Sequence, residues 1–225
     1  MIKKVLNHSL TILFIISLFL LIITFSIGLP IYFRPFYYLQ IKTLNMEELT
    51  GYSYETIKGA YDQVLNYLTL STPFGTGELN YTTEGYNHFA DCKVLFNLNL
   101  IVLIVSFLIV ITLIILSKKE IIQLVEYFKF KPYFFTSIIT ILIPIIIVVL
   151  ASIDFDRAFE IFHAIFFPGK TNWLFDPSKD EIIKVMPQTF FMNCGILIAC
   201  SVIFISIILL VISIIKRKKV AINIK

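Results

Sequence analysis

The sequence predicts an all-α membrane protein with four transmembrane helices and two long extracytoplasmic loops that contain amphipathic helices. Composition is the first indication, because 58% of the residues are hydrophobic, only 15% are charged and the mean hydropathy is +0.87. A soluble domain of this size does not bury so large an apolar fraction. The second indication is a set of four long apolar stretches, and the third is the uneven charge of the segments between them.

Four stretches are apolar over a length that crosses a bilayer, since about 20 helical residues span roughly 30 Å of hydrocarbon. None of the four contains an acidic or basic residue, as expected when one charge at the bilayer centre costs about 2.5 to 3.5 kcal/mol. We expect a single integral membrane domain over residues 1–225, with the first apolar stretch kept as an anchor rather than cleaved. The expected spans are residues 10–33, 95–116, 134–153 and 194–215.

The charges of the connecting segments predict the orientation. Residues 34–94 carry four basic and seven acidic side chains, and residues 154–193 carry four basic and six acidic ones. Basic residues predominate instead in the N-terminal segment, in the short loop between the second and third spans, and in the C-terminal tail. Because positively charged segments stay on the cytoplasmic side, we expect both termini in the cytoplasm and the two acidic segments as outer loops.

Each outer loop is expected to contain an amphipathic helix. Apolar residues recur through residues 54–70 with the period of one helical face, and Ser53 is suited to cap the N-terminus of that helix. The second loop begins with a similar pattern over residues 154–167, in which Glu160 and His163 are three positions apart and therefore share a face.

The candidate catalytic residues are two histidines in the outer loops. The sequence contains no GxSxG or HExxH motif, and its three cysteines lack the spacing of a redox or zinc site, so we expect neither a cofactor nor a metal. His88 and His163 each have a carboxylate at helical spacing, Asp91 and Glu160 respectively, which we expect to orient the imidazole. Histidines at a membrane interface also act as helix caps or snorkelling side chains, so a structural role stays open.

A resemblance to a known family rests on the order and spacing of several short elements. These are His88-x-x-Asp91-Cys92, Phe162-His163-x-x-Phe166-Phe167, Trp173-x-Phe175-Asp176-Pro177-x-x-Asp180 and Pro187-x-x-Phe190-Phe191. They resemble those of the bacterial lipoprotein intramolecular transacylase family, called Lit, and the resemblance covers essentially the whole chain. Cys92 departs from the family pattern, in which a small aliphatic residue is more usual. This departure leaves His88 intact and concerns only the local packing.

The resemblance implies an acyltransferase that needs no second substrate. Its reaction would move the sn-2 acyl chain of the diacylglyceryl group on a lipoprotein's N-terminal Cys to the α-amine of the same Cys, which gives a lyso-form lipoprotein. The implied partners are diacylglyceryl-modified bacterial lipoproteins and membrane lipids, with no nucleic acid. The implied location is the bacterial cytoplasmic membrane, as a multi-pass protein with its active site at the outer leaflet.

The same resemblance leads us to expect roles for individual residues. One of His88 and His163 would take the amine proton and the other would return a proton to the glyceryl leaving oxygen. Trp173 and Arg34 are candidates for stabilising the developing oxyanion. Four aromatic residues would line the acyl site, although lipid-facing or core positions would explain them equally well. They are Phe159, Phe162, Phe166 and Phe167.

Two alternative functions fit the same residues. A membrane lipid hydrolase or intermolecular acyltransferase would use the same histidine pair with water or a lysolipid as the acceptor. A non-enzymatic accessory or sensor protein with four spans would use the outer loops to bind a partner and the histidines to sense pH.

Overall fold

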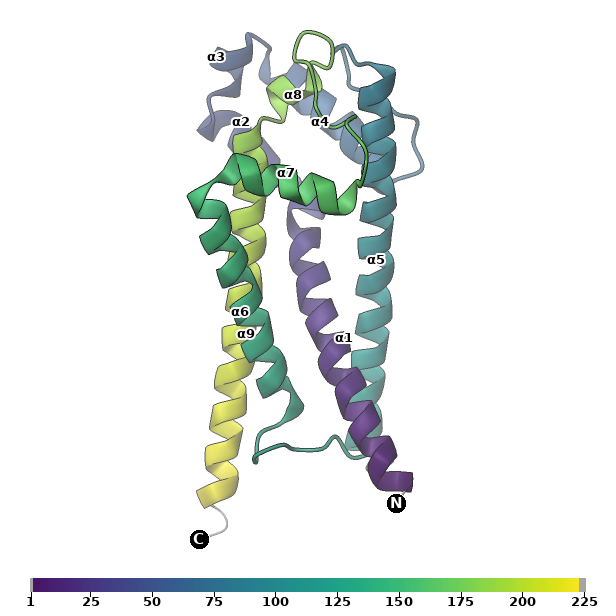
Figure 1. The fold of residues 1–225 in the computed structure, drawn as a ribbon, viewed down its shortest axis with the longest axis vertical. Helices are drawn as coiled ribbons and strands as arrows, with labels where there is room; N and C mark the ends of the chain where they lie inside the picture. Colours follow the sequence, from purple (N-terminus) through teal and green to yellow (C-terminus); the bar gives the residue numbers. More distant parts are fainter. Residues whose placement is uncertain (1, 223–225) are drawn as a thin grey trace. The chain divides into compact units, whose positions relative to one another are not determined.

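The computed structural model describes residues 2–222, with side chains described as far as residue 217. Every regular element in that range is a helix, apart from one isolated bridge between Tyr127 and Phe130 (Figure 1). The long helices are α1 (Ile2–Tyr32), α5 (Thr83–Lys118), α6 (Pro132–Ile153) and α9 (Gln188–Ile222). The shorter helices are α2 (Pro35–Thr43), α3 (Met46–Thr50), α4 (Tyr54–Thr69), α7 (Phe155–Phe166) and α8 (Ile182–Val185).

The four long helices are each long and apolar enough to cross a membrane. The expected spans fall within them, apart from Phe33, which lies one residue beyond the end of α1. Between 17% and 33% of the residues in the most apolar window of each helix are buried, so most of their apolar side chains face outward. The prediction of an all-α protein with four membrane-spanning helices is confirmed.

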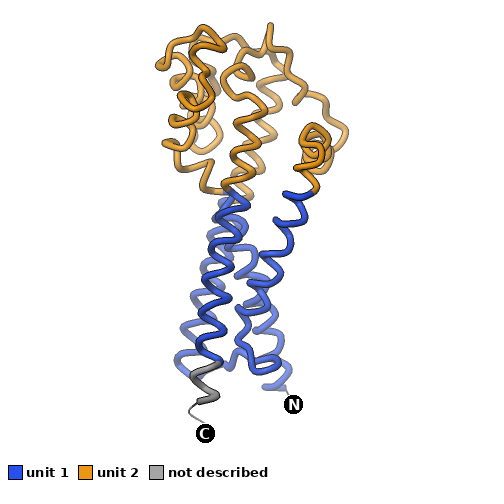
Figure 2. The backbone as a smooth tube through the Cα atoms, turned by 90° about the vertical axis from the view of Figure 1, so that its left-hand side faces the viewer, with its two compact units in different colours: residues 1–27, 100–149, 198–225 blue, residues 28–99, 150–197 orange. Residues whose placement is uncertain are grey.

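The chain groups into two compact units, which Figure 2 shows in different colours. Unit 1 consists of Met1–Ile27, Leu100–Val149 and Ile198–Lys225, and unit 2 consists of Gly28–Asn99 and Leu150–Leu197. Unit 2 therefore contains both segments that were expected as outer loops, together with the ends of the long helices that flank them. All of the candidate site residues lie in unit 2.

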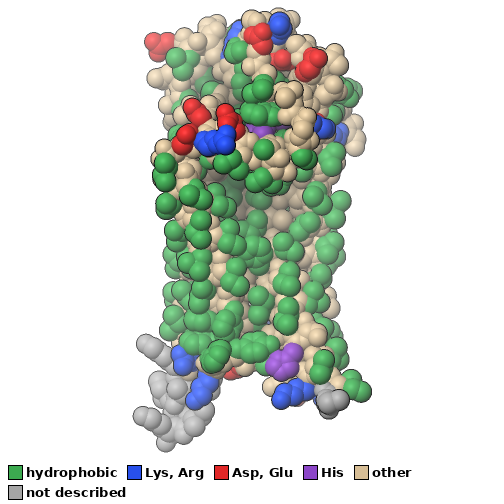
Figure 3. All heavy atoms as spheres, in the orientation of Figure 1, with side chains coloured by type: hydrophobic (Ala, Val, Ile, Leu, Met, Phe, Trp, Pro, Cys, Tyr) green, Lys and Arg blue, Asp and Glu red, His purple; other side chains and the backbone are tan. Residues whose placement is uncertain are grey.

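Unit 1 is built from the apolar parts of the long helices. Its buried core joins residues of three helices, and Ser206 contacts Thr140 with 2.7 Å between the two hydroxyl oxygens. Figure 3 shows apolar side chains over the visible face of these helices and Lys and Arg side chains gathered at one end of the unit. The core residues are Phe14, Leu18, Ile22, Val110, Leu113 and Val202.

In unit 2, the predicted amphipathic helix of the first loop is present as α4. The Ser53 hydroxyl accepts a hydrogen bond from the Thr56 N–H at 3.2 Å, which confirms it as the N-cap. The apolar face of α4 is buried and includes Tyr61, whose ring stacks on that of Tyr37 from α2 with 3.6 Å between the centroids. The helices α2 and α3 were not predicted, because both are short and carry no clear amphipathic period.

A buried carboxylate binds the loop that follows α7 to the start of α5. Asp180 is 4% exposed and accepts hydrogen bonds from the Thr82 N–H at 2.7 Å and from the Thr82 hydroxyl at 2.9 Å. Thr82 in turn accepts from the N–H of Gly85 at 3.0 Å, in the first turn of α5. The loop that follows α7 is thus anchored to the helix that carries His88.

The predicted helix of the second loop is present as α7. The Asp154 side chain caps it by accepting from the Arg157 N–H at 2.9 Å. His163 is the one buried residue of α7, whereas Ile165 is 66% exposed and Glu160 also lies on the surface. The sequence pattern therefore places a single imidazole on the inner edge of an otherwise exposed helix.

Candidate active site

The structure brings the two candidate histidines together. His88, in the second turn of α5, and His163, near the end of α7, have their ring centroids 5.8 Å apart. Their side chains belong to residues that are only 7% and 5% exposed. A buried histidine pair from two segments 75 positions apart in the sequence is a candidate catalytic centre.

Aromatic rings enclose the pair. Phe167 contacts both imidazoles, with its centroid 5.1 Å from that of His88 and 5.7 Å from that of His163. The Trp173 indole stacks on His163 at 4.3 Å with only 22° between the ring planes. Phe175 meets His88 edge-on at 5.4 Å. These contacts keep water away from most of each imidazole.

This enclosure keeps both imidazoles neutral at pH 7. Burial is the main cause that lowers the pKa of His88 to about 4; His163 contributes in the same direction, and Asp91 acts in the opposite direction. Burial also lowers the pKa of His163, against a smaller opposing effect of its hydrogen bond to the Phe159 carbonyl. Two neutral histidines each offer one N–H donor and one nitrogen lone pair.

The hydrogen bond of His163 defines its tautomer. Its Nδ1 lies 2.7 Å from the backbone carbonyl oxygen of Phe159, one helical turn earlier in α7. A carbonyl oxygen only accepts, so Nδ1 carries the proton and Nε2 presents a lone pair. His163 is therefore oriented as a base through Nε2.

His88 has the opposite pattern of contacts. Its Nε2 lies 3.4 Å from the sulfur of Cys92, which is one turn later in α5. Its Nδ1 is buried and has no hydrogen-bond partner among the described residues. A buried ring nitrogen without a partner is costly in a resting protein, and a substrate atom would satisfy it.

The two carboxylates that were expected to orient the imidazoles form their hydrogen bonds with other partners, although the charge of Asp91 still acts on His88. Asp91 accepts hydrogen bonds from Lys170 and, at 3.1 Å, from the Asn172 amide. Glu160 is exposed and pairs with Arg157 at 2.9 Å. The physical reason on α7 is that the Phe159 carbonyl lies within reach of the His163 ring, whereas the Glu160 side chain points outward.

The two expected oxyanion donors are also engaged elsewhere. The Arg34 guanidinium forms a 2.9 Å ion pair with Asp62 of α4 and has no described contact with either histidine. The Trp173 indole N–H donates to the Lys170 carbonyl at 3.1 Å, so Trp173 presents its ring face, not its N–H, to His163. In the structure Trp173 therefore covers one face of the His163 ring.

The four phenylalanines that were expected to line an acyl site divide into two pairs. Phe159 and Phe167 touch the imidazoles, and Phe159 also lies 5.9 Å from Phe191 of α9. Phe162 and Phe166 are 49% and 48% exposed on the outer side of α7, although Phe162 still meets His163 at 5.4 Å. Only Phe159 and Phe167 therefore pack against the histidines on the inner side of α7.

The residues that sequence reasoning did not assign to the site include Lys170, Asn172, Cys92 and Phe175. The first two hold Asp91 from a loop with no regular structure, and no periodic pattern in the sequence signals such contacts. Cys92 was expected to affect packing only, but its sulfur contacts the catalytic candidate His88. The spacing of four positions on a helix was a signal for this contact.

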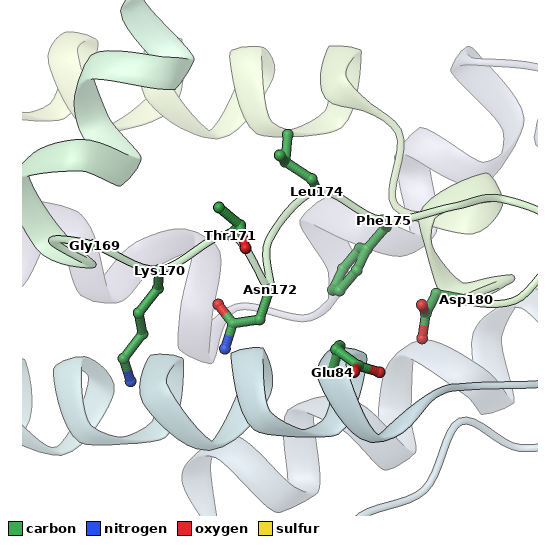
Figure 4. A pocket seen from close by; sticks show the side chains of 8 residues that line it. All are labelled: Glu84, Gly169, Lys170, Thr171, Asn172, Leu174, Phe175 and Asp180. Carbon is green, nitrogen blue, oxygen red and sulfur yellow. The ribbon is translucent and has the colours of Figure 1, made fainter.

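A pocket of about 360 Å³ lies between the loop that follows α7 and the start of α5, and neither histidine lines it. Figure 4 shows Lys170 and Asn172 reaching from this loop toward α5, with Glu84 of α5 opposite Phe175. Phe175 is shared, because it lines the pocket and also packs on His88. Within the described residues, no group of three His, Cys, Asp or Glu side chains is arranged to hold a metal ion.

Comparison of the sequence with models of protein families shows which family the chain belongs to. The family model described as "Lipoprotein intramolecular transacylase Lit" matches residues 12–191. The chain belongs to the Lit family. The resemblance inferred from the motifs is thereby confirmed, and membership of this family makes the protein an acyltransferase of the lipoprotein intramolecular transacylase type.

Solved structures of Lit from Bacillus cereus agree with this assignment. One is 26% identical to this chain, covers 97% of it and 100% of its own chain, and superimposes with a TM-score of 0.86. Two others of the same protein, with one histidine replaced by arginine or by alanine, are 25% identical and each give a TM-score of 0.79. They cover 98% and 97% of this chain and 96% and 98% of their own. No curated protein matches the sequence.

Proposed function

We propose that this Lit-family protein moves the sn-2 acyl chain of a diacylglyceryl group to the α-amine of the same lipoprotein N-terminal Cys. The product is a lyso-form lipoprotein with one acyl chain on nitrogen. The observation that carries the proposal is the buried pair His88 and His163, two neutral imidazoles whose contacts leave a base on one and an unpaired nitrogen on the other. Their chemistry suits an amine nucleophile and an ester carbonyl in one site.

His163 is proposed as the general base. Its Nε2 lone pair would take the proton of the attacking amine, while the Phe159 carbonyl holds Nδ1–H in place. An α-amine has a pKa of about 7.7 to 8.0 and a free histidine about 6.5, and burial lowers the pKa of His163 further. The proton transfer is therefore uphill by at least about 2 kcal/mol, which is small against the barrier of acyl transfer.

His88 is proposed as the donor to the developing oxyanion, through Nδ1–H. The amine nitrogen attacks the ester carbonyl carbon, its proton passes to His163, and the carbonyl oxygen accepts a hydrogen bond from His88 as it gains charge. The bond from that carbon to the glyceryl oxygen then breaks, and His163 returns the proton to the oxygen. This differs from the expected division into one acid and one base, because a neutral His88 that gave up its proton would become an imidazolate.

The enclosure of the pair supports transfer within one substrate over hydrolysis. The amine and the ester belong to the same molecule, so the enzyme needs only to fold the substrate and hold the two groups together. Phe167 and Trp173 cover the imidazoles on which a water nucleophile would depend. An activated serine or cysteine is unnecessary, because no covalent enzyme intermediate forms.

We place the reaction at the outer leaflet of the bacterial cytoplasmic membrane, with both termini in the cytoplasm. The support is the distribution of charge, with basic residues in the terminal segments and the middle loop and an acidic excess in the two long segments that hold the histidines. Diacylglyceryl-modified lipoproteins are membrane-bound, so a site at the level of the lipid headgroups meets them without extracting their acyl chains.

The test is mass spectrometry of the N-terminal peptide of a reporter lipoprotein from a host that lacks N-acylation. Co-expression with the native chain is expected to convert the diacylglyceryl peptide to one with a single acyl chain on nitrogen and one left on glycerol. His88→Ala and His163→Ala are expected to abolish the conversion. His8→Ala is the matched control, since His8 lies in unit 1 and contacts Tyr127.

Membrane levels of all variants are to be measured by immunoblotting. Conversion that persists in both histidine variants at equal abundance would refute the roles of the pair. Release of free fatty acid without N-acylation would instead favour a hydrolase, and transfer to added lysolipid an intermolecular acyltransferase.

A further inference from the structure

We propose that Cys92 is a positioning residue that selects the tautomer of His88 by donating its S–H to Nε2, so that the ring proton stays on Nδ1. The catalytic consequence rests on the proposed function, whereas the tautomer itself does not. The inference combines two independent observations, the contact between the Cys92 sulfur and Nε2 at 3.4 Å and the buried Nδ1 without a partner.

The fold makes this contact a fixed one. Cys92 follows His88 by four positions on α5, so the two side chains lie on the same face one turn apart. The His88 ring is held on its other sides by Phe167 and Phe175, which prevents it from turning away from the sulfur. A ring rotation that exchanged the two nitrogens would have to displace both phenyl groups.

The direction of the hydrogen bond follows from the chemistry of the two partners. Burial is the main cause that raises the pKa of the Cys92 thiol to about 12, and the neighbouring Asp91 charge acts in the same direction, so the sulfur keeps its proton. A thiol is a weak donor and sulfur is a weaker acceptor still, whereas an unprotonated imidazole nitrogen is a strong acceptor. Donation from S–H to Nε2 is therefore favoured, because the imidazole nitrogen is a better acceptor than the sulfur.

A hydrogen bond in the opposite direction would leave His88 unable to donate to the oxyanion. If Nε2–H donated to sulfur, Nδ1 would be a bare lone pair and would repel the carbonyl oxygen that becomes the oxyanion. With the thiol as donor, the unpaired group is instead an N–H, which suits an oxyanion or an ester oxygen. In this chain Cys92 thus favours the tautomer in which His88 donates a hydrogen bond from Nδ1.

The experiment is ¹⁵N NMR of the full-length protein labelled only at histidine. The chain has three histidines, so His88→Ala identifies the resonances of His88. Protonated and unprotonated ring nitrogens differ strongly in ¹⁵N chemical shift, which reads the tautomer directly. In the native protein we expect His88 as the Nδ1–H form. Cys92→Ser, which keeps a donor, is expected to retain this form, and Cys92→Val, which has none, is expected to lose it.

The activity of the same variants provides the second readout. Cys92→Val, which introduces the kind of small aliphatic residue that is more usual in the family, is expected to stay active but to lower kcat for N-acylation by up to about tenfold with little change in KM, because the thiol no longer holds the Nδ1–H form of His88. Cys92→Ser is expected to retain most of the native kcat because it keeps a hydrogen-bond donor. If Cys92 served only to fill space, the donor would make no such difference.

An Nε2–H form of His88 in the native protein, or an unchanged tautomer in Cys92→Val, would overturn the inference. The native spectrum decides the question even where a variant fails to fold. A native protein with the Nδ1–H signature but without transacylase activity would refute the proposed function and leave the role of Cys92 standing.

Discussion

Substitution of Gly85 by alanine is expected to break the hydrogen bonds that hold the loop after α7 against the start of α5. A Cβ at this position would stand 2.2 Å from Asp180 Oδ1 and 3.0 Å from its carboxyl carbon, too close for any real contact. The carboxylate would have to move away from Thr82, whose N–H and hydroxyl both donate to it. Because Asp180 is buried, it finds no water to replace these partners.

The size of the effect follows from the lost hydrogen bonds. Each hydrogen bond to a charged group contributes about 1.5 to 3 kcal/mol, and alanine returns about 1 kcal/mol through its better helix propensity. With partial retention of the two bonds, we expect a net loss of about 3 kcal/mol. For a chain of this length, that lowers Tm by roughly 6 to 12 °C. Transacylase activity is expected to fall as well, because the loop carries Trp173 and Phe175.

The assay is thermal unfolding in detergent with a matched glycine control. Gly59 lies inside α4, and a Cβ there meets nothing within 4 Å, so Gly59→Ala is expected to be neutral or stabilising by up to about 1 kcal/mol. The Gly85 substitution should lose most of its cost in an Asp180→Ala background, since the clashing atoms are gone. Equal Tm values for Gly85→Ala and Gly59→Ala would refute the reasoning.

Three further predictions concern the neighbourhood of the pair. The pKa of His88 is about 4 in the folded state and about 6.5 in the unfolded state, so the unfolded state binds more protons between these two pH values. The free energy of unfolding therefore falls as pH falls, by up to about 3 kcal/mol from pH 7 to pH 4. Thermal unfolding of the native protein against His88→Ala measures this, and parallel pH curves would contradict it. Trp173→Ala is expected to lower kcat about tenfold relative to Trp173→Phe, because phenylalanine retains a ring on His163; equal kcat values would show that the stack does not matter. Lys170→Met removes the charged one of the two partners of Asp91, and it is expected to cost at most about 1 kcal/mol of stability, since Lys170 is 47% exposed. It is also expected to lower activity more than Lys179→Met, which breaks an exposed ion pair in the same loop.

Much of the fold was predictable because it follows from one-dimensional patterns. Long uncharged stretches give the four spans, and the apolar period over residues 54–70 gives α4 within one residue of its observed end. The cap at Ser53 follows from its position before that period. By contrast, α2 and α3 are short helices shaped by burial of Tyr37 and Met46, and no period of their own marks them.

The sequence named candidate residues for the site but not the contacts that these residues make. The sequence singled out His88 and His163 as candidates in two separate acidic segments, but only the structure shows that their rings meet. The sequence could not show that the Phe159 carbonyl, a backbone atom, would compete with Glu160 for the ring of His163. It also could not show that Lys170 would take Asp91, because that contact depends on how an irregular loop returns to α5.

If His163 is the base that we propose, its position on α7 would make the reaction depend on the thickness of the surrounding lipid bilayer. The same two turns of helix that hold the imidazole inward expose Phe162, Ile165 and Phe166 on the other edge, with no protein among the described residues to cover them. In a bilayer these side chains would settle at the boundary between headgroups and acyl chains. The depth of that boundary varies with lipid composition, so thinner or thicker membranes would draw α7, and the base with it, nearer to or further from the ester.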